Sequence, residues 1–104
     1  MVAAFPPEEF DWDEHNVRKN WDKHRVTFAE CEEMFFNEPL LVGAVERSKI
    51  AYREGRFLGY GMTNAKRLLF VVFALRGRRL RVISARDMSR KERNLYHEET
   101  KGSH

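Results

Sequence analysis

Five arginines fall between positions 76 and 86 of this 104-residue chain. The segment reads R-G-R-R-L-R-V-I-S-A-R, and apolar residues separate the arginines as in a β-strand. A guanidinium group keeps its charge at physiological pH, and its planar fork of N–H donors fits two oxygens of a phosphate group. The pattern therefore predicts phosphate binding, with nucleic acid as the first class of partner to consider. The competing interpretation is that these arginines only keep an exposed strand soluble.

The segment follows an apolar run that predicts a buried strand. Residues 68–75 read L-L-F-V-V-F-A-L, and Gly77 can take the positive φ that a tight hairpin turn often needs. On a regular second strand, Arg79 and Arg81 share one face, whereas Arg81 and Arg86 are an odd number of residues apart and point to opposite faces. Arg86 lies at the end of this strand, where the chain turns toward Ser89, so its side chain could turn to either face. The hairpin is thus expected to present a cationic surface.

The charges are separated along the chain. Residues 1–45 hold 4 Lys and Arg against 10 Asp and Glu, whereas residues 46–93 hold 14 against 4. Such a basic half attracts polyanions, with an affinity that falls as the salt concentration rises. The modest net charge of +3 hides this separation.

The length of the chain predicts one domain. We assign residues 1–9 to a flexible arm, 10–99 to the domain and 100–104 to a tail. The lone Cys31 excludes an intramolecular disulfide, and no Cys/His spacing resembles a zinc site, so we expect neither a metal nor another cofactor. We see no signal peptide and no apolar run near the ~20 residues that span a bilayer, so we expect a cytoplasmic protein without a membrane partner.

The spacing of apolar residues predicts an α+β fold. Helices are expected to begin after Asp13, at the capping box that Thr27 opens, and at a second capping box that Ser89 opens. Short turns between successive strands imply an antiparallel meander of about four strands, with two helices before it and one after it. The expected order is a short strand, two helices, four strands and a helix, at residues 10–12, 13–24, 28–36, 40–45, 56–62, 67–75, 79–85 and 89–98.

An ordered series of short motifs resembles the BrnT toxin family and covers about residues 10–97. Each motif alone is weak, but the order and the spacing together are specific. The series includes Phe10-Asp11-Trp12-Asp13, Lys23-His24, Phe36-Asn37-Glu38-Pro39, Glu54-x-Arg56, Arg67-Leu68, Val71-Val72-Phe73, Arg81-Val82-Ile83-Ser84-Ala85-Arg86 and Glu92-Arg93-x-x-Tyr96.

The resemblance implies a toxin of a type II toxin–antitoxin pair with a fold similar to RelE-type messenger RNA interferases. It implies a metal-independent endoribonuclease that cuts mRNA, free or on the ribosome, and arrests translation. The implied partner is a ribbon-helix-helix antitoxin similar to BrnA, which covers the site and carries the contact with operator DNA. A non-catalytic module that binds nucleic acid or the antitoxin is the alternative with the same charge pattern.

A metal-free ribonuclease must deprotonate the ribose 2′-hydroxyl, stabilise the charge on the pentacoordinate phosphorus and protonate the departing 5′-oxygen. Arginines can supply the second function. Glu54 is a candidate base held ionised by neighbouring arginines, although it could equally be an ion-pair partner of Arg56. The expected catalytic residues are Glu54, Arg56, Arg81 and Arg86, and the expected RNA-binding residues are His24, Arg67, Arg76, Arg79 and Tyr96.

Two of these residues have a structural interpretation of similar weight or greater. His24 is the alternative acid or base, since histidine is the residue type suited to proton transfer at neutral pH, but near the end of a helix it is more often a cap or a core residue. Tyr96 could stack on a base or pack in the core beside Leu95.

The sequence also departs from the family pattern. Arg25 stands where relatives have the glycine that ends the first helix with positive φ. Gly55 replaces an often acidic residue, and Gly59 replaces an apolar strand residue. These changes bear on the local geometry of the site more than on the fold.

Overall fold

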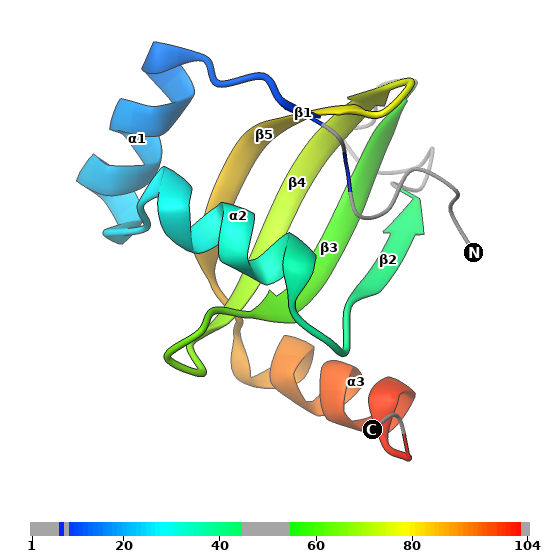
Figure 1. Cartoon of the computed structure of the whole chain (residues 1–104). Helices are drawn as coiled ribbons and strands as arrows, with labels where there is room; N and C mark the ends of the chain where they lie inside the picture. The colour runs from blue at the N-terminus through cyan, green and yellow to red at the C-terminus, as the bar shows by residue number, and fades with distance from the viewer. Residues whose placement is uncertain (1–6, 8, 45–54, 103–104) are drawn as a thin grey trace.

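The computed structural model describes residues 7, 9–44 and 55–102. Over these residues the chain forms three helices and one five-stranded sheet (Figure 1). The α+β class and the predicted order of elements are confirmed. In chain order the elements are β1 (Glu9–Phe10), α1 (Glu14–His24), α2 (Phe28–Phe36), β2 (Leu41–Ala44), β3 (Arg56–Met62), β4 (Leu68–Arg76), β5 (Arg79–Asp87) and α3 (Arg90–Thr100).

The sheet has five strands rather than about four, in the order β1-β5-β4-β3-β2. Strands β2 to β5 form the expected antiparallel meander. The additional strand, β1, lies parallel to β5, with Glu9 beside Arg79 and Phe10 beside Leu80. The sheet is therefore mixed. A strand of two residues has no pattern that shows its partner, and here the partner lies far along the chain.

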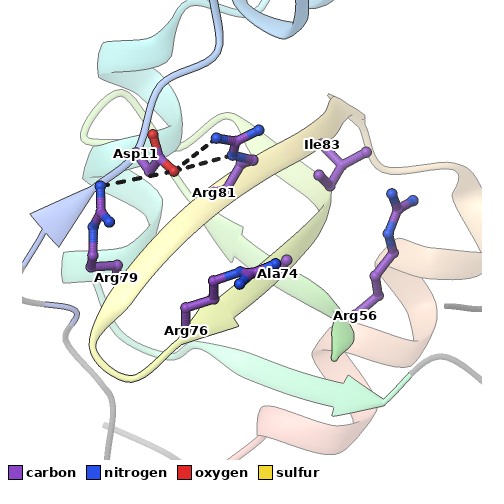
Figure 2. A pocket seen from close by; sticks show the side chains of 7 residues that line it. All are labelled: Asp11, Arg56, Ala74, Arg76, Arg79, Arg81 and Ile83. Atoms are coloured by element: carbon purple, nitrogen blue, oxygen red, sulfur yellow. Dashed lines mark hydrogen bonds and ion pairs between the residues drawn. The ribbon is translucent and has the colours of Figure 1, made fainter. Parts of the chain in front are cut away.

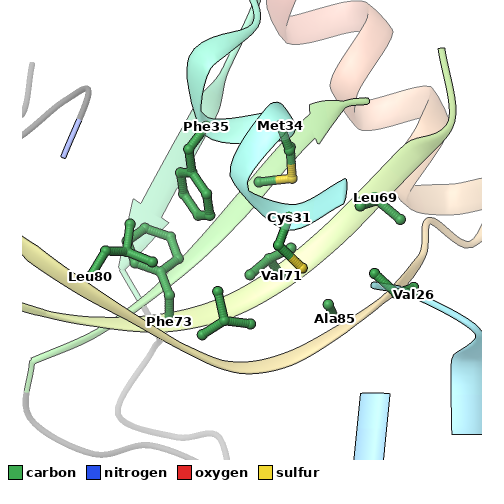
Figure 3. Packing of buried hydrophobic residues seen from close by; sticks show 10 residues of the cluster. Val26, Cys31, Met34, Phe35, Leu69, Val71, Phe73, Leu80 and Ala85 are labelled. Atoms are coloured by element: carbon green, nitrogen blue, oxygen red, sulfur yellow. The ribbon is translucent and has the colours of Figure 1, made fainter. Parts of the chain in front are cut away.

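The hydrophobic core lies between α2 and one face of the sheet (Figure 3). Alternate residues of β4 point into it, because successive side chains of a strand point to opposite faces. The opposite face of β4 and β5 is therefore left to form a surface. The buried core residues of α2, β4 and β5 are Cys31, Met34, Phe35, Leu69, Val71, Phe73, Leu80, Val82 and Ala85.

Helix α2 packs closely on β3 because two glycines of that strand face the core. A Cβ atom at Gly61 would lie 2.6 Å from Met34 Cγ, and one at Gly59 would lie 3.2 Å from both Met34 Cε and a ring carbon of Phe73. The departure from the family pattern at Gly59 thus leaves space that Met34 and Phe73 fill.

Helix α1 ends at the position where the family resemblance expects glycine. Arg25 takes the left-handed conformation there, with φ 53° and ψ 41°. Its guanidinium carbon lies 5.0 Å from the centre of the Trp21 ring. A left-handed non-glycine residue costs roughly 1–2 kcal/mol. Arg25 is thus strained, and its contact with Trp21 offsets part of the cost.

No helix in the described part of the chain is long and apolar enough to cross a membrane.

Candidate nucleic-acid interface

Strand β5 contains a β-bulge. Val72 of β4 pairs with Ser84, but the next residue, Phe73, pairs with Val82, so Ile83 is an extra residue in β5. Helix α1 covers the edge of β5 here, since Lys19 Nζ donates to the Ile83 carbonyl at 3.0 Å. A bulge shifts the alternation of side chains by one residue. The faces of β5 residues on either side of Ile83 therefore cannot be deduced from sequence separation.

The bulge places Arg81 and Arg86 on the same face of the sheet. Arg81 pairs with Ala74 and Arg86 with Phe70, and these two β4 residues both point away from the core. The expectation of opposite faces, which assumed a regular strand, is wrong. Both arginines belong to the surface opposite α2.

The open face of the sheet carries a cleft of about 530 Å³ beside the turn between β4 and β5 (Figure 2). Arginines from β3, β4 and β5 surround it, with small or apolar residues between them. Because four guanidinium groups line one hollow, the cleft suits a polyanion. The lining residues are Arg56, Arg76, Arg79, Arg81, Ala74, Ile83 and Asp11.

Asp11 supplies the one carboxylate among the lining residues of the cleft. Its Oδ2 accepts hydrogen bonds from Arg81 Nη2 at 2.9 Å and Nε at 3.3 Å, and Arg79 Nη2 lies 4.0 Å away. Asp13 lies 3.6 Å from Arg81, and Glu9 forms an ion pair with Arg79. The hydrogen bond from Arg81 holds the pKa of Asp11 below its ordinary value, so this carboxylate is ionised at neutral pH.

Arg86 lies outside the cleft and holds α3 against the sheet. Its Nη1 and Nη2 donate to the two carboxylate oxygens of Glu92, each at 2.8 Å, and its guanidinium carbon lies 4.4 Å from the centre of the Phe70 ring. Glu92 also accepts the backbone N–H of Ser89 in the capping box of α3. Arg86 thus has a structural task that Arg81 does not have.

Arg67 is likewise occupied by the fold. It donates to Asp87 at 2.7 Å, to Glu30 at 3.1 Å, and to the carbonyls of His24 and Arg25 at 3.0 and 2.8 Å. These contacts join the end of α1 to α2 and to the end of β5. Arg67 is not among the residues that line the cleft.

Two further expected site residues, Tyr96 and His24, lie apart from the cleft. Tyr96 is 1% exposed and its hydroxyl donates to the Pro39 carbonyl at 2.6 Å, so its ring is not available for stacking. His24 lies near Asp87, at the end of β5 away from the cleft. Glu54 lies outside the described residues. Among those that are described, no three or more His, Cys, Asp or Glu side chains group so as to hold a metal ion.

Of the expected residues, the structure brings together Arg56, Arg76, Arg79 and Arg81. The sequence reasoning missed Asp11 as a member of the site. The signal was weak, since Asp11 is only one of 10 acidic residues in the first 45. Its proximity to the arginines depends on the parallel pairing of β1 with β5.

The fold and the cleft define a small α+β protein with an arginine-lined cleft on the open face of its sheet. The family model described as "Ribonuclease toxin, BrnT, of type II toxin-antitoxin system" matches residues 12–92. This match covers most of the chain, which therefore belongs to the BrnT family. The family expected from the motifs is confirmed.

A solved structure supports the same assignment. The chain is similar to the ribonuclease toxin BrnT of Brucella abortus, known from a crystal structure at 1.1 Å resolution. The two are 25% identical with a TM-score of 0.57, and the alignment covers 79% of this chain and 97% of that one. No curated protein sequence matches the chain.

Proposed function

We propose that this protein is a metal-independent endoribonuclease that cuts mRNA in the cytoplasm and thereby arrests translation. The observation that carries the proposal is the cleft lined by Arg56, Arg76, Arg79 and Arg81. The family is described as a ribonuclease toxin, which supports a nuclease and an RNA substrate. A RelE-like relationship of the fold agrees with this activity and is part of the proposal.

In the proposed reaction the ribose 2′-hydroxyl gives its proton to the general base, and its oxygen attacks the adjacent phosphorus. A cyclic phosphate forms, the bond to the 5′-oxygen breaks, and the departing 5′-oxygen takes up a proton from solvent. The arginines bind the non-bridging oxygens and stabilise the additional negative charge of the transition state. Charge-assisted hydrogen bonds are strong where water is excluded, and one such donor is worth on the order of 3 kcal/mol in the transition state.

The general base of the proposed reaction is Glu54. It precedes Arg56, which lines the cleft, by two residues in the sequence. His24 is the less favoured candidate, because it lies near Asp87 at the other end of β5.

A type II toxin implies an antitoxin partner. We propose that this partner is a ribbon-helix-helix protein similar to BrnA, and that it inhibits the toxin by covering the arginine cleft. Operator DNA then contacts the antitoxin rather than this chain.

The test is incubation of the purified protein with RNA, with and without EDTA, followed by gel analysis of the products. Wild-type protein should cleave in both conditions, and Arg81→Ala should cleave about 100-fold more slowly. Arg18→Ala is the matched control, because Arg18 is exposed on α1 and, among the described residues, forms an ion pair with Glu14 only.

Intact RNA, both free and on translating ribosomes, would falsify the enzymatic proposal. RNA that is bound with a salt-sensitive affinity but never cut would identify the alternative, a non-catalytic binding module.

A further inference from the structure

The two β5 arginines of the cleft already have carboxylate partners (Figure 2). The Asp11 carboxylate lies between Arg79 and Arg81, and both ion pairs use the same oxygen atom, Oδ2. The Nε and Nη2 groups of Arg81 that hold it form one edge of the guanidinium fork. This edge is the part of arginine that binds phosphate oxygens.

We propose that Arg79 and Arg81 form a subsite for a phosphodiester group of RNA, and that Asp11 occupies this subsite until RNA displaces it. The inference rests on the proposed function, since it takes RNA as the polyanion of the cleft. A carboxylate and a phosphodiester both present oxygen acceptors to the fork, and the same edge cannot bind both at once. Asp11 therefore acts as an internal competitor of the substrate.

The contacts of Asp11 are of the kind that a ligand can replace. The side chains of Asp11 and Arg81 are 34% and 44% exposed, and ion pairs at this exposure contribute little to stability. The pair between Arg86 and Glu92 is different, because Glu92 is only 19% exposed, uses both oxygens and also caps α3. A phosphate can thus displace Asp11 without disturbing a helix.

Displacement of Asp11 also leaves the backbone of its segment in place. The Asp11 N–H donates to the Leu80 carbonyl at 2.8 Å, independently of the side chain. The carboxylate can rotate away while β1 stays paired with β5. The hydrogen bond from Arg81 lowers the pKa of Asp11, so protonation does not relieve the competition at neutral pH.

The experiment measures the affinity for a short RNA with 2′-O-methyl ribose throughout, which cannot supply a 2′-hydroxyl nucleophile. Fluorescence anisotropy compares wild type with Asp11→Asn, which keeps the shape of the side chain and removes its charge. We expect Asp11→Asn to bind about 2- to 5-fold more tightly, the effect of removing one exposed ion pair.

Glu14→Gln is the matched control. It changes the net charge equally, but Glu14 pairs with Arg18 and does not line the cleft. Because salt screens charges over a Debye length of about 8 Å, Glu14→Gln should change the RNA affinity of the cleft less than Asp11→Asn does. Equal affinities of Asp11→Asn and Glu14→Gln would overturn the proposal, as would weaker binding by Asp11→Asn or no binding by any variant.

A double-mutant cycle tests whether the effect passes through Arg81. In an Arg81→Gln background, the gain from Asp11→Asn should become smaller, because only the weaker pair with Arg79 remains, and a gain of unchanged size overturns the proposal. Asp11→Ala should also bind the methylated RNA more tightly than wild type. The test therefore still works if Asp11→Asn does not fold. If ordinary RNA is not cleaved, the proposed nuclease activity is wrong. The affinity for the methylated RNA tests the phosphodiester subsite independently of cleavage.

Discussion

Arg81 and Arg86 emerge on the same face of the sheet although five positions separate them, because the bulge at Ile83 adds one residue to β5. Their surroundings nevertheless differ. Arg81 lines the cleft and holds one oxygen of Asp11, whereas Arg86 holds both oxygens of Glu92 and lies over the Phe70 ring. One strand therefore holds an arginine that lines the cleft and an arginine that binds α3 to the sheet.

This difference predicts different effects on stability. Arg86→Ala leaves the partly buried Glu92 carboxylate without its charged partner, and we expect the free energy of unfolding to fall by about 1–2 kcal/mol. Arg81→Ala removes only exposed ion pairs, which contribute little to stability, so it should lower the free energy of unfolding less than Arg86→Ala does. Urea unfolding, monitored by circular dichroism, measures both values. Equal losses would contradict the conclusion that Arg86 stabilises the fold more than Arg81 does.

Glu92 should also make stability depend on pH. Burial raises the pKa of Glu92, but the hydrogen bonds from Arg86 and from the Ser89 N–H outweigh it and hold the pKa below the ordinary 4.5. The stabilisation is therefore present above about pH 4.5, the pKa in the unfolded chain, and is lost as the pH falls through the lower pKa of the folded protein.

In Glu92→Gln this contribution is absent at every pH. Urea midpoints between pH 3 and 7 should therefore fall less steeply for Glu92→Gln than for wild type on the acid side. Parallel curves would show that Glu92 does not contribute.

Gly61 should not tolerate a side chain, because a Cβ atom there would lie 2.6 Å from Met34 Cγ. Gly61→Ala forces Met34 or α2 to move, and we expect a loss of about 1–3 kcal/mol in the free energy of unfolding. Gly43→Ala in β2 is the control, since no atom lies within 4 Å of its added Cβ. Thermal unfolding compares them, and similar melting temperatures would contradict the close packing of α2 on β3.

Arg25 should be replaceable by glycine with a gain or no loss. Arg25→Gly removes the strain of the left-handed conformation but also the contact with Trp21, whereas Arg25→Ala keeps the strain and loses the contact. We expect Arg25→Gly to be more stable than Arg25→Ala by about 1 kcal/mol. Chemical denaturation measures the difference, and the opposite order would place the strain elsewhere.

Local sequence was sufficient for much of the fold. Thr27 with Glu30 and Ser89 with Glu92 form the predicted capping boxes, because these hydrogen bonds join residues three apart. The hairpin of β4 and β5 was also predictable, because the apolar run of β4 and the glycine turn after it are adjacent in the sequence. The order of elements followed from such local patterns.

By itself, the sequence determined the elements, the separation of charge and the arginine-rich strand, since each depends on neighbours along the chain. Only the tertiary structure decided that Arg79 and Arg81 meet Arg56 and Asp11 in one cleft and that Arg86 binds Glu92 instead. The physical reason is that the pairing of β1 with β5, the bulge and the docking of α3 depend on contacts between distant segments. The local propensities of the individual segments do not specify these contacts.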